Sequence, residues 1–323
     1  MKKKIEKKEL LGKTIDIHTH AGGINFTNYY LSAFPYCSNI SDLILNMNVN
    51  NIDYSVTFPV PTNINTKNSP MIDKELRRII QKYEKHPYYY ENMRLLKEAE
   101  IFGDNKILPF IMLSLYSKID LQIESYYELM EKYPIYGFKI NASTDYVDIK
   151  EILHNEKLKL FLVEQGLPIM FHSSQDLYCS GENILSLAKE LPSVRMCAAH
   201  LGRLDQNILD YINRLDNLWF DFSPVIKLFD TLKQTNSDFF AKKGINKCED
   251  LINYLYKNYD SKLLYGSDYP WCYCGYLDSF VNNNLSHMYD ENVKVLKKLP
   301  KKTQKTVSTV NAINYLYGGH KYD

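Results

Sequence analysis

Apolar residues are arranged along the chain in short runs that alternate with longer stretches of helical spacing. Eight runs rich in Ile, Val, Phe, Tyr or Leu, each flanked by Pro, Gly, Asn or Asp, predict β-strands. They comprise Thr14–His20, Ile52–Pro61, Ile107–Ser114, Tyr136–Ser143, Leu167–Ser174, Arg195–Gly202, Leu218–Pro224 and Leu263–Pro270. Amphipathic segments between them predict helices, among them Ile149–Glu164, Gly181–Leu191 and Asp205–Leu215.

Alternation of continuous apolar strands with helices is typical of an α/β protein whose parallel sheet is covered by helices. Eight such units in 323 residues fit a closed (β/α)8 TIM barrel better than an open doubly wound sheet. The first predicted strand is not followed by a GxGxxG motif, which argues further against the open sheet. Because no Pro/Gly/Ser-rich linker divides the chain, we predict one barrel domain over residues 1–323.

Two segments are longer than a minimal barrel requires. Residues 61–103 follow the second predicted strand and contain a charged, Tyr-rich helix around Asp73–Tyr90, and residues 225–262 follow the seventh and contain a further helical pair. Both segments leave from the carboxyl end of a strand, where a barrel places its active site. We therefore expect helical insertions after strands 2 and 7 that cover the pocket. Packing on the outside, or self-association as a homodimer, is the alternative.

Charge and composition exclude several classes of partner. The chain is 45% hydrophobic and 24% charged, as is ordinary for a globular protein, and its net charge of +1 favours neither nucleic acid nor an acidic membrane. Residues 1–13 are Lys-rich and are followed by no apolar stretch, which predicts a flexible leader instead of a signal peptide. The six cysteines lack the regular spacing of a disulfide-rich secreted domain, which predicts reduced thiols in a cytoplasmic protein.

Polar side chains stand where several of the predicted strands end. His18 and His20 are two residues apart on the first strand, so their imidazoles point to the same face. His172, His200 and Asp268 lie near the carboxyl ends of three further predicted strands. In a barrel these ends meet at one mouth, and converging imidazoles and a carboxylate are typical ligands of a first-row divalent metal. A buried polar network without metal is the alternative, but it would require complete pairing of these groups.

Small residues lie two positions before two of these groups. Ala198 precedes His200, and Gly266 precedes Asp268. A purely structural barrel would favour Val, Ile or Leu in this layer. The small residues therefore leave room for ligand side chains to meet.

The order of these motifs resembles that of the amidohydrolase superfamily. The resemblance rests on Asp16-Ile17-His18-Thr19-His20, then His172, then His200 with Gly202, then Gly266-Ser267-Asp268-Tyr269-Pro270. It runs essentially end to end, and the closing segment 311–318 is similar to the Asn-Ala…Phe-Gly terminus of the branch that includes aminocarboxymuconate semialdehyde decarboxylase.

The resemblance implies metal ligands at His18, His20, His172 and Asp268, and it implies that His200 holds a metal-bound water or polarises the substrate. We expect one divalent metal, zinc, with Mn²⁺ or Fe²⁺ as alternatives. Such a metal lowers the pKa of a bound water toward about 7. Asp268 would then take the proton as general base.

Lys139, at the end of the fourth predicted strand, has three possible roles. In binuclear members of the superfamily a carboxylated Lys at this strand bridges two metals. In the decarboxylase-like branch a Lys in a similar context lacks that role, which favours Lys139 as a substrate contact; a structural ion pair is the third possibility. This chain has Asn141-Ala142 where that branch often shows His-Pro, which leaves the substrate contacts open.

The motifs predict a metal-dependent hydrolase that cuts a C–N or C–O bond in a small carbonyl-containing, anionic molecule through a metal-activated water. A decarboxylase with the same metal cage and a non-catalytic metal-binding barrel are the alternatives. Arg203 directly follows His200-Leu201-Gly202, so we expect it to open the next helix and bind an acidic group of the substrate. Solvent exposure or pairing with Asp205 is the alternative for Arg203. Tyr269 and Trp271 are expected to form walls of the pocket.

Overall fold

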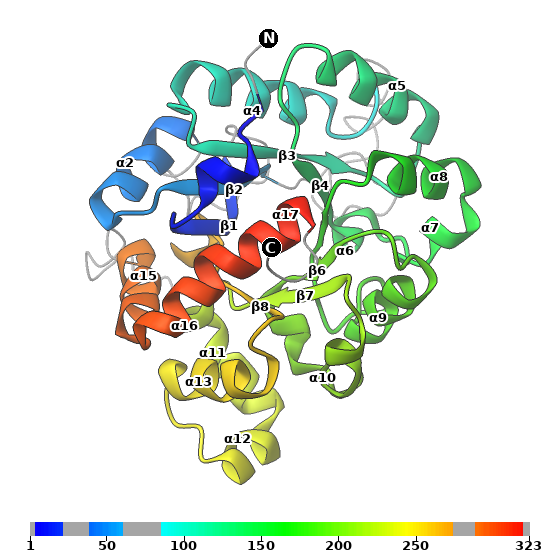
Figure 1. The fold of residues 1–323 in the computed structure, drawn as a ribbon. Coiled ribbons are helices and arrows are strands. Elements are labelled where there is room, and N and C mark those ends of the chain that lie inside the picture. Colours follow the sequence, from blue (N-terminus) through cyan, green and yellow to red (C-terminus); the bar gives the residue numbers. More distant parts are fainter. Residues whose placement is uncertain (1–3, 22–38, 61–84, 274–287, 319–323) are drawn as a thin grey trace.

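The computed structural model describes residues 4–21, 39–60, 85–273 and 288–318. Its eight strands are parallel and follow one another in chain order, as predicted for a TIM barrel (Figure 1). The strands are β1 (Ile15–Ala21), β2 (Tyr54–Pro59), β3 (Ile107–Leu113), β4 (Gly137–Ile140), β5 (Ile169–Phe171), β6 (Met196–Ala198), β7 (Leu218–Asp221) and β8 (Leu263–Leu264).

Backbone hydrogen bonds between β1 and the segment after β8 close the ring. Ile17 N donates to Tyr265 O at 3.0 Å, and Asp268 N donates to His18 O at 2.7 Å. Asp268 is thereby tied to the strand that carries His18 and His20.

Several strands are shorter than the apolar runs that predicted them. β5, β6 and β8 end before His172, His200 and Asp268, respectively, so these three residues lie beyond the regular ladder. His200 and Asp268 have φ values of 57° and 56°, which no strand residue adopts. At His200 and Asp268 the backbone has therefore left the extended conformation of the sheet.

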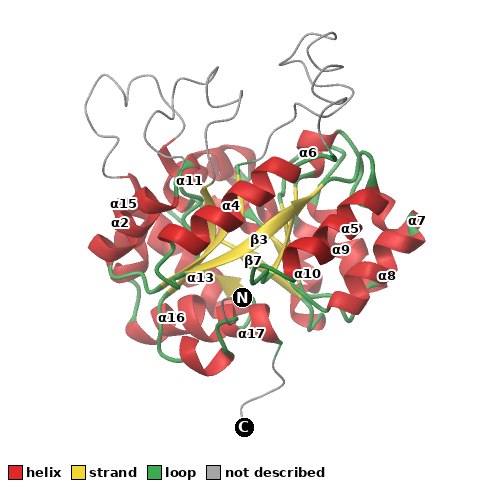
Figure 2. Cartoon of the chain, turned by 90° about the horizontal axis from the view of Figure 1, so that it is seen from above, coloured by secondary structure: helices red, strands yellow, loops and turns green. Residues whose placement is uncertain are grey.

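Helices surround the strands on the outside of the barrel (Figure 2). They are α2 (Ile40–Asn50), α4 (Tyr89–Phe102), α5 (Ile119–Met130), α6 (Ala142–Asp145), α7 (Glu151–His154), α8 (Glu156–Gln165), α9 (Gly181–Glu190), α10 (Gln206–Tyr211), α11 (Val225–Thr235), α12 (Ser237–Lys243), α13 (Cys248–Tyr259), α15 (Met288–Lys298), α16 (Lys301–Lys305) and α17 (Asn311–Tyr317). None of the helices in the described ranges is long and apolar enough to cross a membrane.

Two helix predictions between strands need correction. The predicted helix 149–164 is divided into α7 and α8 at Asn155, where the backbone is extended. The side chain of Asn155 accepts a hydrogen bond from Leu158 N at 3.0 Å and so caps α8. The predicted helix 205–215 is α10 followed by a 3₁₀ turn, η3 (Ile212–Arg214). An Asn side chain that accepts a hydrogen bond from a backbone N–H favours the start of a new helix, which explains why the predicted helix 149–164 is divided at Asn155.

The two insertions also differ in detail from the prediction. Most of the helix predicted around residues 73–90 lies outside the described residues; of its described end, residues 85–88 are not helical, and α4 begins only at Tyr89. Tyr88 has a φ of 62°, so the backbone turns before the helix starts. The segment after β7 contains three helices, α11, α12 and α13, where a pair was predicted.

The lower end of the barrel is sealed by both ends of the described chain. Inward-facing strand residues pack with Ala312, Tyr315 and Leu316 of α17, which lies over the middle of the ring in Figure 1. The predicted flexible leader packs here from its fourth residue on. It forms a 3₁₀ turn, η1 (Lys7–Leu10), that buries Leu10, and Ile5 N donates to Tyr136 Oη at 2.6 Å. Packing of Ile5 and Leu10 against the barrel stabilises this segment in spite of its lysines.

Candidate active site

A cavity of about 340 Å³ opens at the carboxyl ends of the strands. The predicted metal ligands, the predicted catalytic residues and the predicted substrate contacts line it, except His18, which is buried. The cavity is lined by His20, Lys139, Asn141, His172, His200, Arg203, Pro224, Lys227, Leu228, Thr231, Asp268 and Trp271. Of the two predicted aromatic walls, only Trp271 is in this lining; Tyr269 is buried and packs edge-on against Tyr289 at 5.6 Å between ring centroids.

His18 and His20 both face the interior because of an irregularity in β1. The register of β1 against β2 shifts between Asp16 and Thr19. Below the shift Ile15 and Ile17 pack in the barrel core, and above it His18 and His20 turn toward the mouth. A bulge of this kind re-aims side chains next to a site without ending the strand.

The two rings are held from behind at Nδ1. His18 Nδ1 lies 3.0 Å from Asp221 Oδ2, and His20 Nδ1 lies 3.0 Å from the carbonyl oxygen of Pro59. Since a carbonyl and a carboxylate only accept hydrogen bonds, both Nδ1 atoms act as donors. The lone pair of each neutral ring is therefore on Nε2, which faces the interior.

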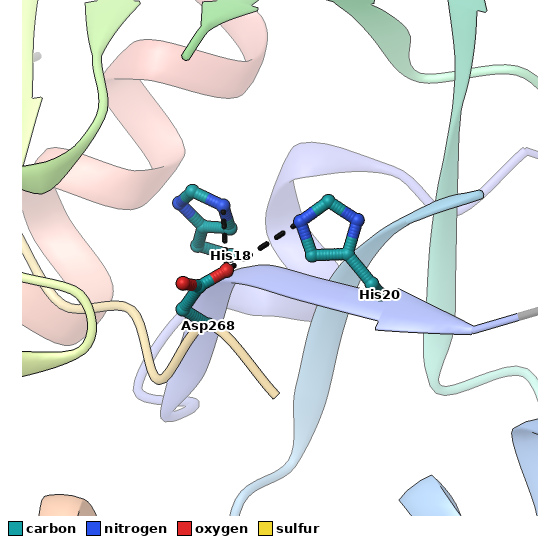
Figure 3. A group of neighbouring side chains, drawn as sticks. All are labelled: His18, His20 and Asp268. Atoms are coloured by element: carbon teal, nitrogen blue, oxygen red, sulfur yellow. Dashed lines mark ion pairs between the residues drawn. The ribbon is translucent and has the colours of Figure 1, made fainter. Parts of the chain in front are cut away.

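Asp268 completes a three-residue cluster with these rings (Figure 3). Its Oδ1 lies 3.3 Å from His18 Nε2 and 3.5 Å from His20 Nε2. Asp16 supports this arrangement, because its Oδ1 accepts hydrogen bonds from His18 N at 3.1 Å and from Ser267 N at 3.0 Å. The ligand atoms of the cluster all lie within 4.8 Å of one another.

Gly266 allows the close approach of β1 to the segment after β8. A Cβ at this position would lie 2.7 Å from His18 Cβ and 3.1 Å from Ser223 Cβ. The first distance is shorter than carbon atoms tolerate. The small residue predicted to leave room below Asp268 in fact leaves room for the backbone and Cβ of His18.

Replacing Gly266 with Ala should therefore displace His18 as well as destabilise the barrel. We expect a loss of about 1–3 kcal/mol in the free energy of unfolding, as for overpacked cores, together with weaker zinc binding, measured by urea denaturation and by competition with a chelator. Gly166→Ala is the control for metal binding: nothing lies within 4 Å of its added methyl group, and the φ of 58° at Gly166 makes alanine costly by about 1–2 kcal/mol, so this variant loses stability at a position away from His18. Unchanged zinc affinity in Gly266→Ala would contradict the packing argument.

His200 and His172 meet on the other side of the cavity. His200 Nδ1 lies 2.6 Å from the carbonyl oxygen of Ser223, so it donates, and His200 Nε2 lies 3.2 Å from His172 Nδ1. Nε2 of His200 thus accepts a hydrogen bond, and His172 Nδ1 donates it. This leaves Nε2 of His172 free as an acceptor.

A left-handed turn positions His200 and Arg203. The segment η2 (His200–Leu204) has φ values from 53° to 58° throughout, although only Gly202 favours them. Left-handed conformations cost about 1–2 kcal/mol for each residue with a side chain. Arg203 therefore does not open the next helix as predicted: α10 begins at Gln206, with Asp205 as its cap.

Positive side chains surround the cavity. Arg203 Nε donates to the carbonyl oxygen of Ser173 at 2.9 Å, and Lys227 Nζ donates to that of Trp271 at 3.3 Å. Lys139 is buried, with its Nζ 3.4 Å from His18 Nε2 and 4.8 Å from the ring centre of Phe58. Burial lowers the pKa of Lys139 to about 8.

One wall of the cavity comes from the insertion after β7. Lys227, Leu228 and Thr231 recur along one side of α11, and Pro224 precedes them. This spacing places all of them on one face of the helix. The expectation that this insertion covers the pocket is met for α11.

Burial keeps the imidazoles of His20, His172 and His200 neutral, and the surrounding carboxylates favour a cation. Burial lowers the pKa of His20 to about 4 and that of His200 to about 3. Burial also opposes ionisation of Asp268, but His18 and His20 outweigh it and hold the pKa of this carboxyl well below its ordinary value. Burial and Lys139 oppose protonation of His18, yet Asp221 and Asp268 together raise its pKa.

The donor set fits a divalent metal. The Nε2 atoms of His18 and His20 both face one carboxylate oxygen of Asp268, and the nearby Lys139 ammonium lies 3.4 Å from His18 Nε2. A divalent metal among these three atoms would bind both lone pairs and neutralise the carboxylate. Neutral imidazoles and one carboxylate are the ligands that zinc and related metals prefer. His172 lines the same cavity and has its Nε2 available.

Asp221 and Ser223 are among the site residues that were not predicted from the sequence, as are Pro224, Lys227, Leu228 and Thr231 of the cavity lining. Asp221 and Ser223 belong to the carboxyl end of β7 and contact His18 and His200. The available signal was an acidic residue directly after the apolar run Leu218-Trp219-Phe220, at a strand end equivalent to those of the other ligands. A second group of possible ligands, His18, His200 and Asp221, shares one histidine with the first.

Neither a known protein-family model nor a curated protein sequence matches the chain. Solved structures do resemble it. A probable 2-pyrone-4,6-dicarboxylic acid hydrolase from Acinetobacter baumannii, with citric acid bound, is 15% identical with a TM-score of 0.57, over 95% of this chain and 100% of that one. A 5-carboxyvanillate decarboxylase from Novosphingobium aromaticivorans, complexed with manganese and a nitrobenzoic acid, is 12% identical with a TM-score of 0.60, over 95% and 97%.

An amidohydrolase from Burkholderia multivorans with bound zinc is 11% identical with a TM-score of 0.58, over 95% of this chain and 99% of that one. The chain shares the barrel fold of these structures, one of which is an amidohydrolase. These structural neighbours are enzymes, and they include hydrolases and a decarboxylase. Identities this low establish the fold and leave the reaction of this chain to its own residues.

Proposed function

We propose that the protein is a metal-dependent enzyme that hydrolyses a C–N or C–O bond in a small, anionic, carbonyl-containing molecule. The observation that carries this proposal is the arrangement of His18 Nε2 and His20 Nε2 around Asp268 Oδ1, at 3.3 and 3.5 Å, beside a 340 Å³ cavity. The neighbours with bound zinc or manganese support it. That the enzyme works in the cytoplasm, and as a homodimer, remains a prediction.

The residues that would hold one divalent metal, zinc in our proposal, are His18, His20, His172 and Asp268. When bound, such a metal polarises a carbonyl oxygen and lowers the pKa of a water toward about 7. Asp268 is ionised and lies at the cavity, so it can accept a proton from the attacking water and return it to the leaving group.

His200 and the cations bind and orient the other reactants. The Nε2 of His200 carries a lone pair at the cavity, and a water or substrate hydroxyl can donate to it in place of His172. Lys139 and Arg203 line the cavity and offer charged donors to a carboxylate or a carbonyl oxygen. Asn141 adds an uncharged amide to the same lining, where the decarboxylase-like branch often has His.

Decarboxylation is the second candidate reaction. It is favoured by the likeness to a 5-carboxyvanillate decarboxylase and by the lysine and arginine at the cavity, which would hold a substrate carboxylate. Zinc- and manganese-loaded protein should be tested on a panel of lactones, amides and aromatic acids. Release of acid from the lactones or amides without CO₂ supports hydrolysis. If the only product is CO₂ from the aromatic acids, the reaction is decarboxylation and not hydrolysis.

Loss of the Arg203 guanidinium should selectively impair acidic substrates. We expect Arg203→Met to lower kcat/KM for a carboxylated substrate by roughly 10- to 100-fold, since one charged hydrogen bond contributes about 1.5–3 kcal/mol. Arg203→Lys should recover part of this loss. Arg214→Met, at an exposed site outside the cavity, is the matched control. An equal loss for the neutral analogue of the same substrate would disprove the carboxylate contact.

A further inference from the structure

The carboxyl end of β7 contacts two of the imidazoles at the cavity from behind. Asp221 Oδ2 lies 3.0 Å from His18 Nδ1, and Ser223 Oγ lies 2.9 Å from the same nitrogen. The carbonyl oxygen of Ser223 lies 2.6 Å from His200 Nδ1. One short segment therefore meets the outward-facing nitrogen of both rings.

Asp221 is completely buried, and both of its oxygens have partners. Oδ1 accepts from Ser223 N at 2.8 Å, from His200 N at 3.3 Å and from the Ser223 hydroxyl. Oδ2 is left for His18 Nδ1, with Cys197 Sγ more distant at 3.9 Å. A carboxylate is costly to place inside a barrel, and a turn alone would be satisfied by Asn or Ser. Its charge is directed at the imidazole of His18.

This contact decides which nitrogen of His18 carries the proton. A carboxylate cannot donate, so Nδ1 must, and the lone pair of the ring is fixed on Nε2. Nε2 is the atom 3.3 Å from Asp268 Oδ1, in the cluster of possible metal ligands. The hydrogen bond also fixes the rotation of the ring. A carboxylate behind a ligand histidine makes the imidazole more basic and holds it in place for the metal.

We propose that Asp221 is a positioning residue that holds His18 as the Nδ1–H tautomer and thereby sets the metal affinity of the site. The inference rests on the proposed metal-dependent function, but it concerns a residue that contacts His18 and not the reactants. Ser223 contributes less, because its hydroxyl is a second and uncharged partner of the same nitrogen.

The substitution Asp221→Asn tests the proposal, because it keeps the size of the side chain and removes its charge. We expect zinc to bind about 10- to 100-fold more weakly, as found when a carboxylate behind a ligand histidine is removed, measured by competition with a chelator of known affinity. Urea denaturation without metal monitors the fold. Ser223→Ala is the matched control and should change zinc affinity by less than Asp221→Asn does.

Nitrogen NMR of the zinc-loaded wild-type protein gives a second measurement that needs no stable variant. His18 should show a proton bonded to Nδ1, with the signal assigned by its loss in His18→Gln. Wild-type zinc affinity retained in folded Asp221→Asn, or a proton on Nε2 of His18, would overturn the positioning role and leave the proposed function intact. Failure of the wild-type protein to bind zinc, manganese or iron would overturn both.

Discussion

Asp268→Asn should lower kcat by about 10²- to 10⁴-fold, the usual contribution of a general acid–base residue. The amide keeps the shape of the carboxylate but cannot take a proton from the attacking water. It also removes the charge that both Nε2 atoms of His18 and His20 face at 3.3 and 3.5 Å. Steady-state kinetics on a substrate from the panel measure the effect.

Asp238→Asn is the matched control for this experiment. Asp238 is exposed on α12 and outside the cavity lining, so its substitution should leave kcat unchanged. Circular dichroism and urea denaturation establish that Asp268→Asn is folded. A folded Asp268→Asn protein with wild-type kcat would exclude Asp268 as the base.

The substitution His20→Ala should abolish both metal binding and turnover while the barrel persists. His20 offers one of the inward-facing lone pairs, and its Nδ1 donates a hydrogen bond to the carbonyl oxygen of Pro59 at 3.0 Å. The change removes ring contacts with Phe58 and Trp271, so a modest loss of stability is also expected. Turnover should fall to the rate of metal-free protein.

His154→Ala provides the comparison for His20→Ala. His154 is exposed on α7, away from the residues that line the active-site cavity. It should retain the metal content, the turnover and the stability of the wild-type protein. If His20→Ala kept full metal content and activity, His20 would not be a ligand.

The fold and most of the candidate cluster were predictable because they depend on residue type and spacing. Strong apolar runs gave the eight strands in order, and the pair His18 and His20 marked the mouth of the barrel. His172, His200 and Asp268 were found because each lies near the carboxyl end of such a run. In a parallel barrel, strand ends far apart in the sequence necessarily meet.

What the sequence did not reveal depends on local backbone geometry. The register shift in β1 lets the pair His18 and His20 face the interior above Ile15 and Ile17, which also face it, and the shift has no signature in residue type. The left-handed turn at His200–Leu204 contains only one glycine, so the actual direction of Arg203 was not predictable. Asp221 was not predicted because an acidic residue at the end of a strand is equally typical of a helix cap, a surface charge or a site residue. The packing of residues 4–13 was not predicted because the many lysines of this segment indicated a solvated chain, whereas Ile5 and Leu10 pack against the barrel.

Metal content per chain is the measurement that tests the central claim most directly. Protein expressed in metal-supplemented medium and freed of loosely bound ions should contain about one zinc, manganese or iron per chain by elemental analysis. We predict no second metal bridged by a carboxylated Lys139, because the motifs resemble the decarboxylase-like branch, in which a lysine in a similar context lacks that role. Protein that contains none of these metals, yet turns over its substrate at an undiminished rate after chelation, would contradict the account.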